Sequence, residues 1–127
     1  MINLTPHTIR LFARTPYGEP DLKTFVDIPP SGIVARVETI EEDAGVLPVT
    51  NAPEGSHGGS YWNALAVTRR FGEVIGLPED TKEATLVSSI VLGAVPGRPN
   101  TFAPDTGPTA VRDAEGRILG VTRLVAA

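Results

Sequence analysis

Proline and glycine interrupt this chain so often that few long regular elements fit between them. The 127 residues include 13 glycines and 12 prolines. Proline is poorly tolerated inside helices and central strands, and glycine favours turns. This spacing is typical of many short strands joined by turns, so we expect a mainly β chain. Hydrophobic residues make up 41% of the sequence, which is enough for a buried core.

The hydrophobic pattern places short strands between these breaks. Residues 33–38 alternate apolar and polar side chains, the period of a strand with one buried face. Further strands are expected at about residues 2–4, 8–13, 24–28, 46–49, 62–67, 68–75 and 85–87. Residues 62–75 are expected to form either one long bent strand or a hairpin around residues 70–72. One helix is expected at residues 88–95, where Ser88 or Ser89 supplies the N-cap and a Pro-Gly pair ends the helix. The β-branched content of this segment keeps a strand as the alternative.

The C-terminal region reads as a hairpin. Residues 109–112 and 117–125 flank the turn sequence at 113–116. Residues 51–60, which are rich in glycine, are expected to form a flexible loop. The predicted class is therefore α+β, mainly β, with six to eight short, mostly antiparallel strands and one short helix. We expect these elements to form a single globular domain over residues 1–127.

Composition narrows the classes of function. The absence of cysteine excludes disulfides, thiolate metal sites and cysteine nucleophiles. No apolar run reaches the ~20 residues of a membrane-spanning helix, and the first residues lack the basic start and apolar core of a signal peptide. We therefore expect a cytoplasmic protein without a membrane partner.

Charge is distributed unevenly along the chain. The net charge of −4 argues against general nucleic-acid binding, which needs a basic face to neutralise phosphates. Residues 85–127 nevertheless carry four arginines against three acids, whereas residues 1–84 carry twelve acids against seven bases. Arginine offers a planar fork that suits phosphate and carboxylate. The C-terminal third is therefore the predicted location of an anion site, although codon usage in a GC-rich genome also explains an arginine excess.

The predicted ligand residues lie in and beside a proline-rich loop. Arg98 and Arg112 are suited to hold phosphates through paired hydrogen bonds. Asn100 and Asp105 are suited to the polar edge of a base or to ribose hydroxyls, and Phe102 to stacking on a base. Prolines lower the entropy lost when such a loop binds a ligand. The alternative is a structural loop in which Asn100 and Asp105 close turns and Phe102 fills the core.

Three more residues complete the predicted ligand site. Ser88 and Ser89 precede the expected helix, whose free N–H groups attract anions, and simple capping is their alternative role. His7 follows a strand bend, where it contacts the ligand or hydrogen-bonds the backbone. His7 and His57 lack the spacing of a metal site, and the sequence has no Gly-x-Ser-x-Gly or phosphate-loop motif. We therefore expect no metal, no cofactor and no catalytic residue.

Several short motifs are distinctive when taken together. They are Asn3-Leu4-Thr5-Pro6-His7, Ile28-Pro29-Pro30-Ser31-Gly32, Ala35-Arg36, Gly72-Glu73-Val74, Gly76-Leu77-Pro78, Val87-Ser88-Ser89, Gly97-Arg98-Pro99-Asn100, Val111-Arg112-Asp113, Gly116-Arg117 and Gly120. This set resembles a family of small uncharacterised proteins of phages, prophages and actinobacterial genomes. The resemblance covers nearly the whole chain except about residues 41–66, where this chain carries extra loop. By looser analogy, the chain resembles phage counter-defence proteins that sequester nucleotide immune signals.

This resemblance implies a non-catalytic, homo-oligomeric protein of the cytoplasm, the host cytosol if a phage encodes it. Its predicted function is to bind and sequester a small anionic nucleotide-like immune signal, of the cyclic nucleotide or cyclic ADP-ribose type. Two alternatives stay open. The first is a structural or protein-interaction module, such as a virion accessory or an inhibitor of a host protein. The second is a nucleotide phosphodiesterase or hydrolase that uses His7 or His57 with Asp105.

Overall fold

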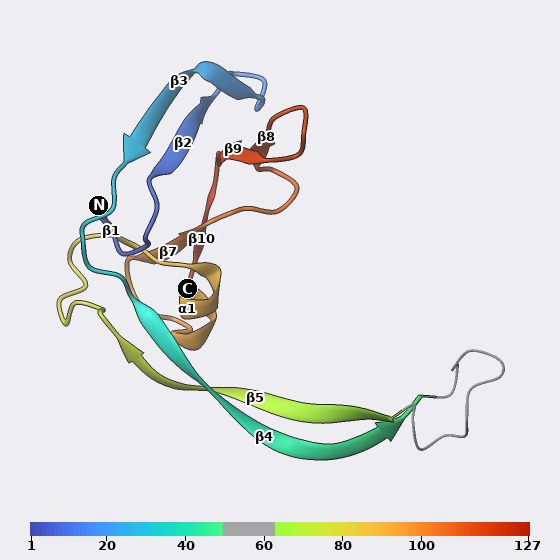
Figure 1. The fold of residues 1–127 in the computed structure, drawn as a ribbon. Helices are drawn as coiled ribbons and strands as arrows, with labels where there is room; N and C mark the ends of the chain where they lie inside the picture. Colours follow the sequence, from blue (N-terminus) through green and yellow to red (C-terminus); the bar gives the residue numbers. More distant parts are fainter. Residues whose placement is uncertain (50–62) are drawn as a thin grey trace. The chain divides into compact units, whose positions relative to one another are not determined.

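The computed structural model describes residues 1–49 and 63–127, so the loop predicted at residues 51–60 lies outside the described residues. The chain separates into two compact units: one comprises Met1–Val37 and Val74–Ala127, and the other Glu38–Glu73 (Figure 1). The fold is α+β and mainly β, with one short helix and several small sheets, as predicted. Within the described ranges, no helix is long and apolar enough to cross a membrane.

A four-stranded sheet forms the centre of the first unit. Its order is β1 (Ile2–Asn3), β6 (Thr85–Leu86), β7 (Thr101–Pro104) and β10 (Leu124–Ala126). β1, β6 and β7 are parallel, and β10 runs antiparallel to β7. A parallel pair cannot be joined by a tight turn and needs a crossover. The segment between β6 and β7 supplies one.

That crossover contains helix α1 (Ser89–Ala94), which confirms the predicted helix. Ser88 is its N-cap, because the Ser88 side chain accepts a hydrogen bond from the backbone N–H of Val91 at 3.4 Å. Val91 is the buried residue of the helix and packs with Leu4, Ala35 and Val87. Capping and this apolar contact together explain why so short a helix forms here.

A buried asparagine joins the start of the chain to the end of a later strand. The side chain of Asn3 is 1% exposed and donates to the carbonyls of His7 (2.8 Å) and Ile28 (2.9 Å). Its oxygen accepts from the Thr5 N–H at 3.0 Å and from the Thr5 hydroxyl at 2.7 Å. The Asn-Leu-Thr-Pro-His motif is therefore a turn that one amide side chain closes.

Two antiparallel pairs complete the first unit. β2 (Ile9–Arg14) pairs with β3 (Pro20–Ile28), with a register shift after Phe12. β8 (Val111–Arg112) pairs with β9 (Ile118–Gly120), which confirms the predicted C-terminal hairpin around the turn at 113–116. The second arm is shorter than predicted, because the chain after β9 crosses to pair as β10 with β7.

β9 lies directly against β2. Val121 accepts from the N–H of Phe12 at 2.8 Å and donates to the carbonyl of Arg10 at 2.9 Å. Gly120 permits this approach, since a Cβ there would lie 2.6 Å from Cε2 of Phe12 and 2.7 Å from the Arg10 oxygen. The contact fixes residues 118–123 beside β2, and these residues line two hollows of the first unit.

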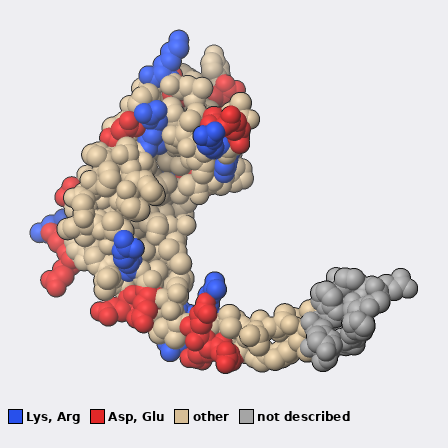
Figure 2. Space-filling view, viewed as in Figure 1, with Lys and Arg blue, Asp and Glu red and all other residues tan. Residues whose placement is uncertain are grey.

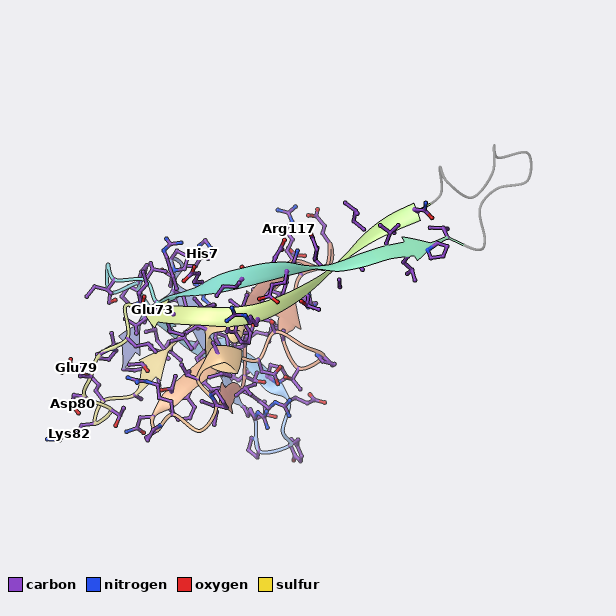
Figure 3. The ribbon with its side chains drawn as sticks, turned by 90° about the horizontal axis from the view of Figure 1, so that it is seen from below. His7, Glu73, Glu79, Asp80, Lys82 and Arg117 are labelled. Atoms are coloured by element: carbon purple, nitrogen blue, oxygen red, sulfur yellow. The ribbon has the colours of Figure 1, made fainter. Side chains whose placement is uncertain are left out.

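The second unit is a long two-stranded ribbon. Its strands are β4 (Arg36–Pro48) and β5 (Asn63–Ile75). The first two residues of β4 and the last two of β5 belong to the first unit. β4 is longer than predicted, because it joins the segments expected as separate strands at residues 33–38 and 46–49. β5 runs as one strand through residues 70–72, so the chain forms the long strand there and not the hairpin. Figure 3 shows the two strands wound around each other, the right-handed twist that two-stranded ribbons adopt.

Candidate functional site

Arg98 and Asn100 hold a surface loop in place. Arg98 Nη2 donates to the Pro78 carbonyl, while its buried Nε has no hydrogen-bond partner among the described residues. Asn100 Nδ2 donates to the carbonyls of Thr81 at 2.7 Å and Lys82 at 3.3 Å. Asn100 has φ of 50°, a turn conformation that asparagine tolerates better than most residues. Both polar side chains are thus engaged with the loop between β5 and β6, whose Glu79, Asp80 and Lys82 project outward in Figure 3.

Ser88 and Phe102 are engaged in the packing of the first unit. Ser88 caps α1 and lines a hollow of about 260 Å³ together with Thr5 and Arg36, whereas Ser89 is exposed. Phe102 is half-buried and packs against the cluster of Ile9, Leu86 and Val121. Phe102 therefore fills the core, which was the alternative to its predicted role of stacking on a base.

Asp105 organises the proline-rich loop that follows β7. One carboxylate oxygen accepts from the N–H of Gly107 at 3.1 Å, and the other from the Thr109 hydroxyl at 3.2 Å. Arg123 donates to the same second oxygen through Nε at 2.9 Å and also through Nη2. The hydrogen bond from Arg123, helped by the Gly107 N–H, lowers the pKa of Asp105 below its usual value. Asp105 is thus a charged anchor of this loop.

Arg112 and His7 flank the same loop. Arg112 donates to the carbonyl of Gly116 at 2.9 Å and to that of Thr106 at 3.1 Å, which joins the loop to the β8–β9 turn. The backbone carbonyl of His7 accepts hydrogen bonds from the side chains of Asn3 and Thr5. His7, which is labelled in Figure 3, is exposed.

The structure therefore divides the predicted ligand set between two places. Asp105 and Arg112 share the loop after β7, whereas Arg98 and Asn100 bind the loop before β6. Within the described ranges, no hydrogen bond or ion pair links one pair to the other. Most of these polar groups satisfy backbone carbonyls or one another.

One hollow beside the Asp105 loop contains a cation without a partner. It measures about 380 Å³ and is lined by Arg14, Gly18, Pro20, Pro108, Thr109, Ala110, Thr122 and Arg123. We call it the Arg14–Arg123 hollow. Arg14 is exposed, and its side chain makes no hydrogen bond or ion pair within the described residues. It ends β2 beyond the register shift, the kind of irregularity that redirects a side chain.

A second hollow, of about 320 Å³, adjoins the other part of the same loop. Its lining includes His7, Arg10 and Thr106, with apolar residues of β9. Arg10 is already committed, because it binds Asp27 through two hydrogen bonds of 2.8 and 3.0 Å. Its guanidinium also lies 3.9 Å from the centre of the Phe25 ring. This hollow thus lacks a free arginine, and the Arg14–Arg123 hollow is the better anion site.

Sequence reasoning selected neither residue of this arginine pair. Arg14 and Arg123 are far apart in the chain, and the contact of β9 with β2 that brings their segments together leaves no local signature. A partial signal existed in the excess of arginine after residue 85, which includes Arg123. Comparisons with protein-family models, curated proteins and solved structures found no match to this chain.

Proposed function

We propose that this chain is a non-catalytic protein that binds and sequesters a small phosphate-bearing, nucleotide-like anion in the Arg14–Arg123 hollow. The observation that carries the proposal is Arg14, a cation with no partner within the described residues, on a hollow that a second arginine also lines. A volume of about 380 Å³ lies within the range of small-ligand sites.

The electrostatics of the hollow favour an anion. Asp105 neutralises one of the two guanidinium groups, so Arg14 and Arg123 together leave one positive charge uncompensated. The ion pair also orients Arg123, which lowers the entropy lost when the ligand binds. The Thr122 hydroxyl reaches the Thr109 carbonyl only at 3.5 Å, so a ligand oxygen is a better acceptor for it.

The class of ligand follows from the sequence. The resemblance to phage and prophage proteins makes a cyclic nucleotide or cyclic ADP-ribose-type signal the first class to test. Both carry phosphates that an arginine fork binds through two hydrogen bonds. Sequestration, in the host cytosol if a phage encodes the chain, requires that the ligand be released unchanged.

Calorimetric titration tests the proposal with cyclic mononucleotides, cyclic dinucleotides, cyclic ADP-ribose isomers and inorganic phosphate. Arg14→Ala should weaken binding by about tenfold or more, because charged hydrogen bonds contribute about 1.5–3 kcal/mol. Arg117→Ala is the matched control: Arg117 is also exposed but binds Glu115 on the β8–β9 turn. Absence of heat with every ligand refutes the proposal, and so does an affinity that Arg14→Ala leaves unchanged. Recovery of altered ligand after heat denaturation would instead identify the hydrolase alternative.

The second candidate function is a protein-interaction module, such as a virion accessory or an inhibitor of a host protein. The observation that favours it is the β4–β5 ribbon, where Leu65 and Val67, neighbours on one face of β5, are 83% and 46% exposed. Large exposed apolar side chains that adjoin one another mark interaction surfaces. Co-purification of one stoichiometric host or virion protein, lost when the ribbon is made polar, would support this function.

A further inference from the structure

β3 is the longest strand of the first unit, and only one of its edges is paired. It pairs with β2 along that edge, and among the described residues no other strand pairs with it, as Figure 1 shows. A free strand edge presents N–H and C=O groups to which another chain can add a strand. The free edge of β3 is therefore a candidate interface.

The hydrogen bonds of β2 show which residues of β3 direct their backbone inward. Arg10 and Phe12 form backbone hydrogen bonds with Val121, at 2.9 and 2.8 Å, on the side of β2 away from β3. Backbone N–H and C=O groups alternate in direction along a strand, so Leu11 directs its groups to β3. Its partner there is Val26, and Val26 therefore directs its own groups to β2.

The two neighbours of this valine, Phe25 and Asp27, direct their N–H and C=O groups to the free edge. Two features limit how far this edge extends. Residues 22–24 bulge out of the pairing with β2, and Pro29, directly after the strand, has no N–H. The regular edge is therefore residues 25–28, which suits a partner strand of similar length.

Two copies of this edge fit one another in a single register. Around a two-fold axis, antiparallel pairing must place outward residues opposite outward residues. An axis through Val26 puts Phe25 opposite Asp27 of the second copy, so all the outward groups of both copies find partners. An axis through Asp27 instead puts Phe25 opposite Pro29, which has no N–H. An axis through Phe25 puts Asp27 opposite Lys23, which lies in the bulge.

The side chains match in the same register. Val26 is 53% exposed, and an axis through it places it directly opposite itself, in a non-hydrogen-bonded pair whose side chains lie close together. On the other face, Asp27 lies opposite Phe25 of the second copy, whose ring centre is 3.9 Å from the Arg10 guanidinium. The ion pair of Arg10 with Asp27 leaves these side chains 39% and 40% exposed, so each has room for a second partner.

Charge separates this register from the other two. An axis through Asp27 opposes two carboxylates, and an axis through Phe25 opposes two rings that each carry an Arg10 cation. Like charges directly opposite each other destabilise a strand pair, whereas opposite charges fix the register. Figure 2 shows acidic and basic side chains close together over the part of the molecule that contains β2 and β3, so no patch of a single charge keeps two copies apart.

The free edge of β3 is thus complementary to itself in hydrogen bonds, apolar contact and charge. We propose that β3 pairs antiparallel with β3 of a second copy, around a two-fold axis through Val26. Residues 24–28 at about 3.4 Å each give a contact about 17 Å long. A contact one strand long buries less than the about 1,200–2,000 Å² of stable complexes. The dimer should therefore form in the micromolar range or above, in rapid exchange with the monomer.

Sedimentation velocity of the full chain tests this, from about 5 µM to about 1 mM. Wild type should shift from monomer to dimer as concentration rises, and Val26→Asp should remain monomeric, because it opposes two like charges on the axis. Leu22→Asp is the matched control: Leu22 is also exposed on β3, at 60%, but lies in the bulge, so this variant should dimerise like wild type. Circular dichroism checks that both variants fold. A monomer at every concentration overturns the proposal, as does a dimer that Val26→Asp leaves intact.

Amide hydrogen exchange of the wild type locates the interface. The N–H groups of Phe25 and Asp27 should exchange rapidly in dilute solution and slowly at about 1 mM, where the dimer forms. The N–H of Val26 bonds to β2 in both states and should be protected at both concentrations. A dimer in which Phe25 and Asp27 stay unprotected uses another surface, and this result overturns the proposal.

A single cysteine tests the register, because the chain has none of its own. The Cα atoms of a non-hydrogen-bonded pair lie about 4.5 Å apart, within the about 4.4–6.8 Å that a disulfide spans. With oxidised glutathione, Val26→Cys should form a disulfide-linked dimer, and Leu22→Cys, which is similarly exposed, should form far less. Equal cross-linking of the two variants excludes the axis through Val26, as does a non-covalent dimer of Val26→Cys that does not cross-link.

Discussion

The buried amide of Asn3 offers the sharpest test of how this fold is held together. Its side chain makes two donor bonds, to His7 and Ile28, and two acceptor bonds from Thr5, all between 2.7 and 3.0 Å. Asn3→Ala removes all of them at a site that is 1% exposed. The Thr5 groups that lose a partner are buried and the carbonyls of His7 and Ile28 lie at partly buried bonds, so replacing the asparagine by water costs free energy.

The expected loss is large for a single polar residue. Net hydrogen bonds contribute about 0.5–1.5 kcal/mol each, and the unsatisfied groups left behind cost further, so Asn3→Ala should destabilise by roughly 3 kcal/mol. This is a large part of the ~5–15 kcal/mol of a typical domain. At about 3–4 °C per kcal/mol for a chain of this size, the melting temperature should fall by roughly 10 °C.

Urea denaturation followed by circular dichroism measures the loss of stability. The slope of the unfolding free energy against urea concentration should stay unchanged, which shows that the folded and unfolded states keep their compactness. Asn100→Gly is the matched control, because the Asn100 amide also binds two carbonyls but is exposed, and glycine tolerates the φ of 50° at this position. It should cost about 1 kcal/mol or less. Asn3→Asp should be at least as harmful as Asn3→Ala at neutral pH, since a carboxylate then faces two carbonyls. A loss below about 0.5 kcal/mol for Asn3→Ala would refute the reasoning.

Two further predictions concern the segments around the Arg14–Arg123 hollow. Gly120→Ala should destabilise the fold by about 1–3 kcal/mol, measured by thermal unfolding, since its Cβ would lie 2.7 Å from the Arg10 carbonyl oxygen; a neutral result would mean that β9 moves freely against β2. The lowered pKa of Asp105 means that its bond to Arg123 stabilises the fold above the usual carboxyl pKa, and that this stability is lost as pH falls through the lower, folded value. Asp105→Asn should therefore be less stable than wild type at pH 7, and the difference in urea midpoint should shrink below about pH 4; a difference independent of pH would contradict this assignment.

Local sequence signals predicted the elements that local interactions stabilise. Ser88 followed by an apolar segment and a Pro-Gly pair predicted α1, and the cap that forms is a bond over three residues. The turn at 113–116 is equally local, because Asp113 accepts from the N–H groups of Glu115 and Arg117. These signals depend on residues within a few positions of each other, which is the range that a single sequence reveals.

Contacts over longer distances were not visible in the same way. Gly72 within β5 suggested a break, yet there it makes room for Glu38 and Ile40 of the neighbouring strand. The parallel pairing of β1 with β6 joins residues about eighty positions apart, and no local turn sequence predicts it. Arg14 belongs to a segment that looked like an ordinary strand end, and only the approach of β9 places it on a hollow with Arg123.

The residues predicted as ligand contacts show why motif and site differ in this chain. Asn100 and Asp105, which were predicted as ligand contacts, both use their side chains to close a loop, and so does Asn3 of the Asn-Leu-Thr-Pro-His motif. A polar residue that already makes internal hydrogen bonds must break them before it can bind a ligand. The free energy lost is similar to the free energy gained from the new hydrogen bonds. A ligand therefore binds most favourably where a charge lacks a partner, and Arg14 meets this condition on a hollow of suitable size. The loops that Asn3 and Asp105 close position the segments on either side of it, so their substitution should lower affinity only to the extent that it lowers stability.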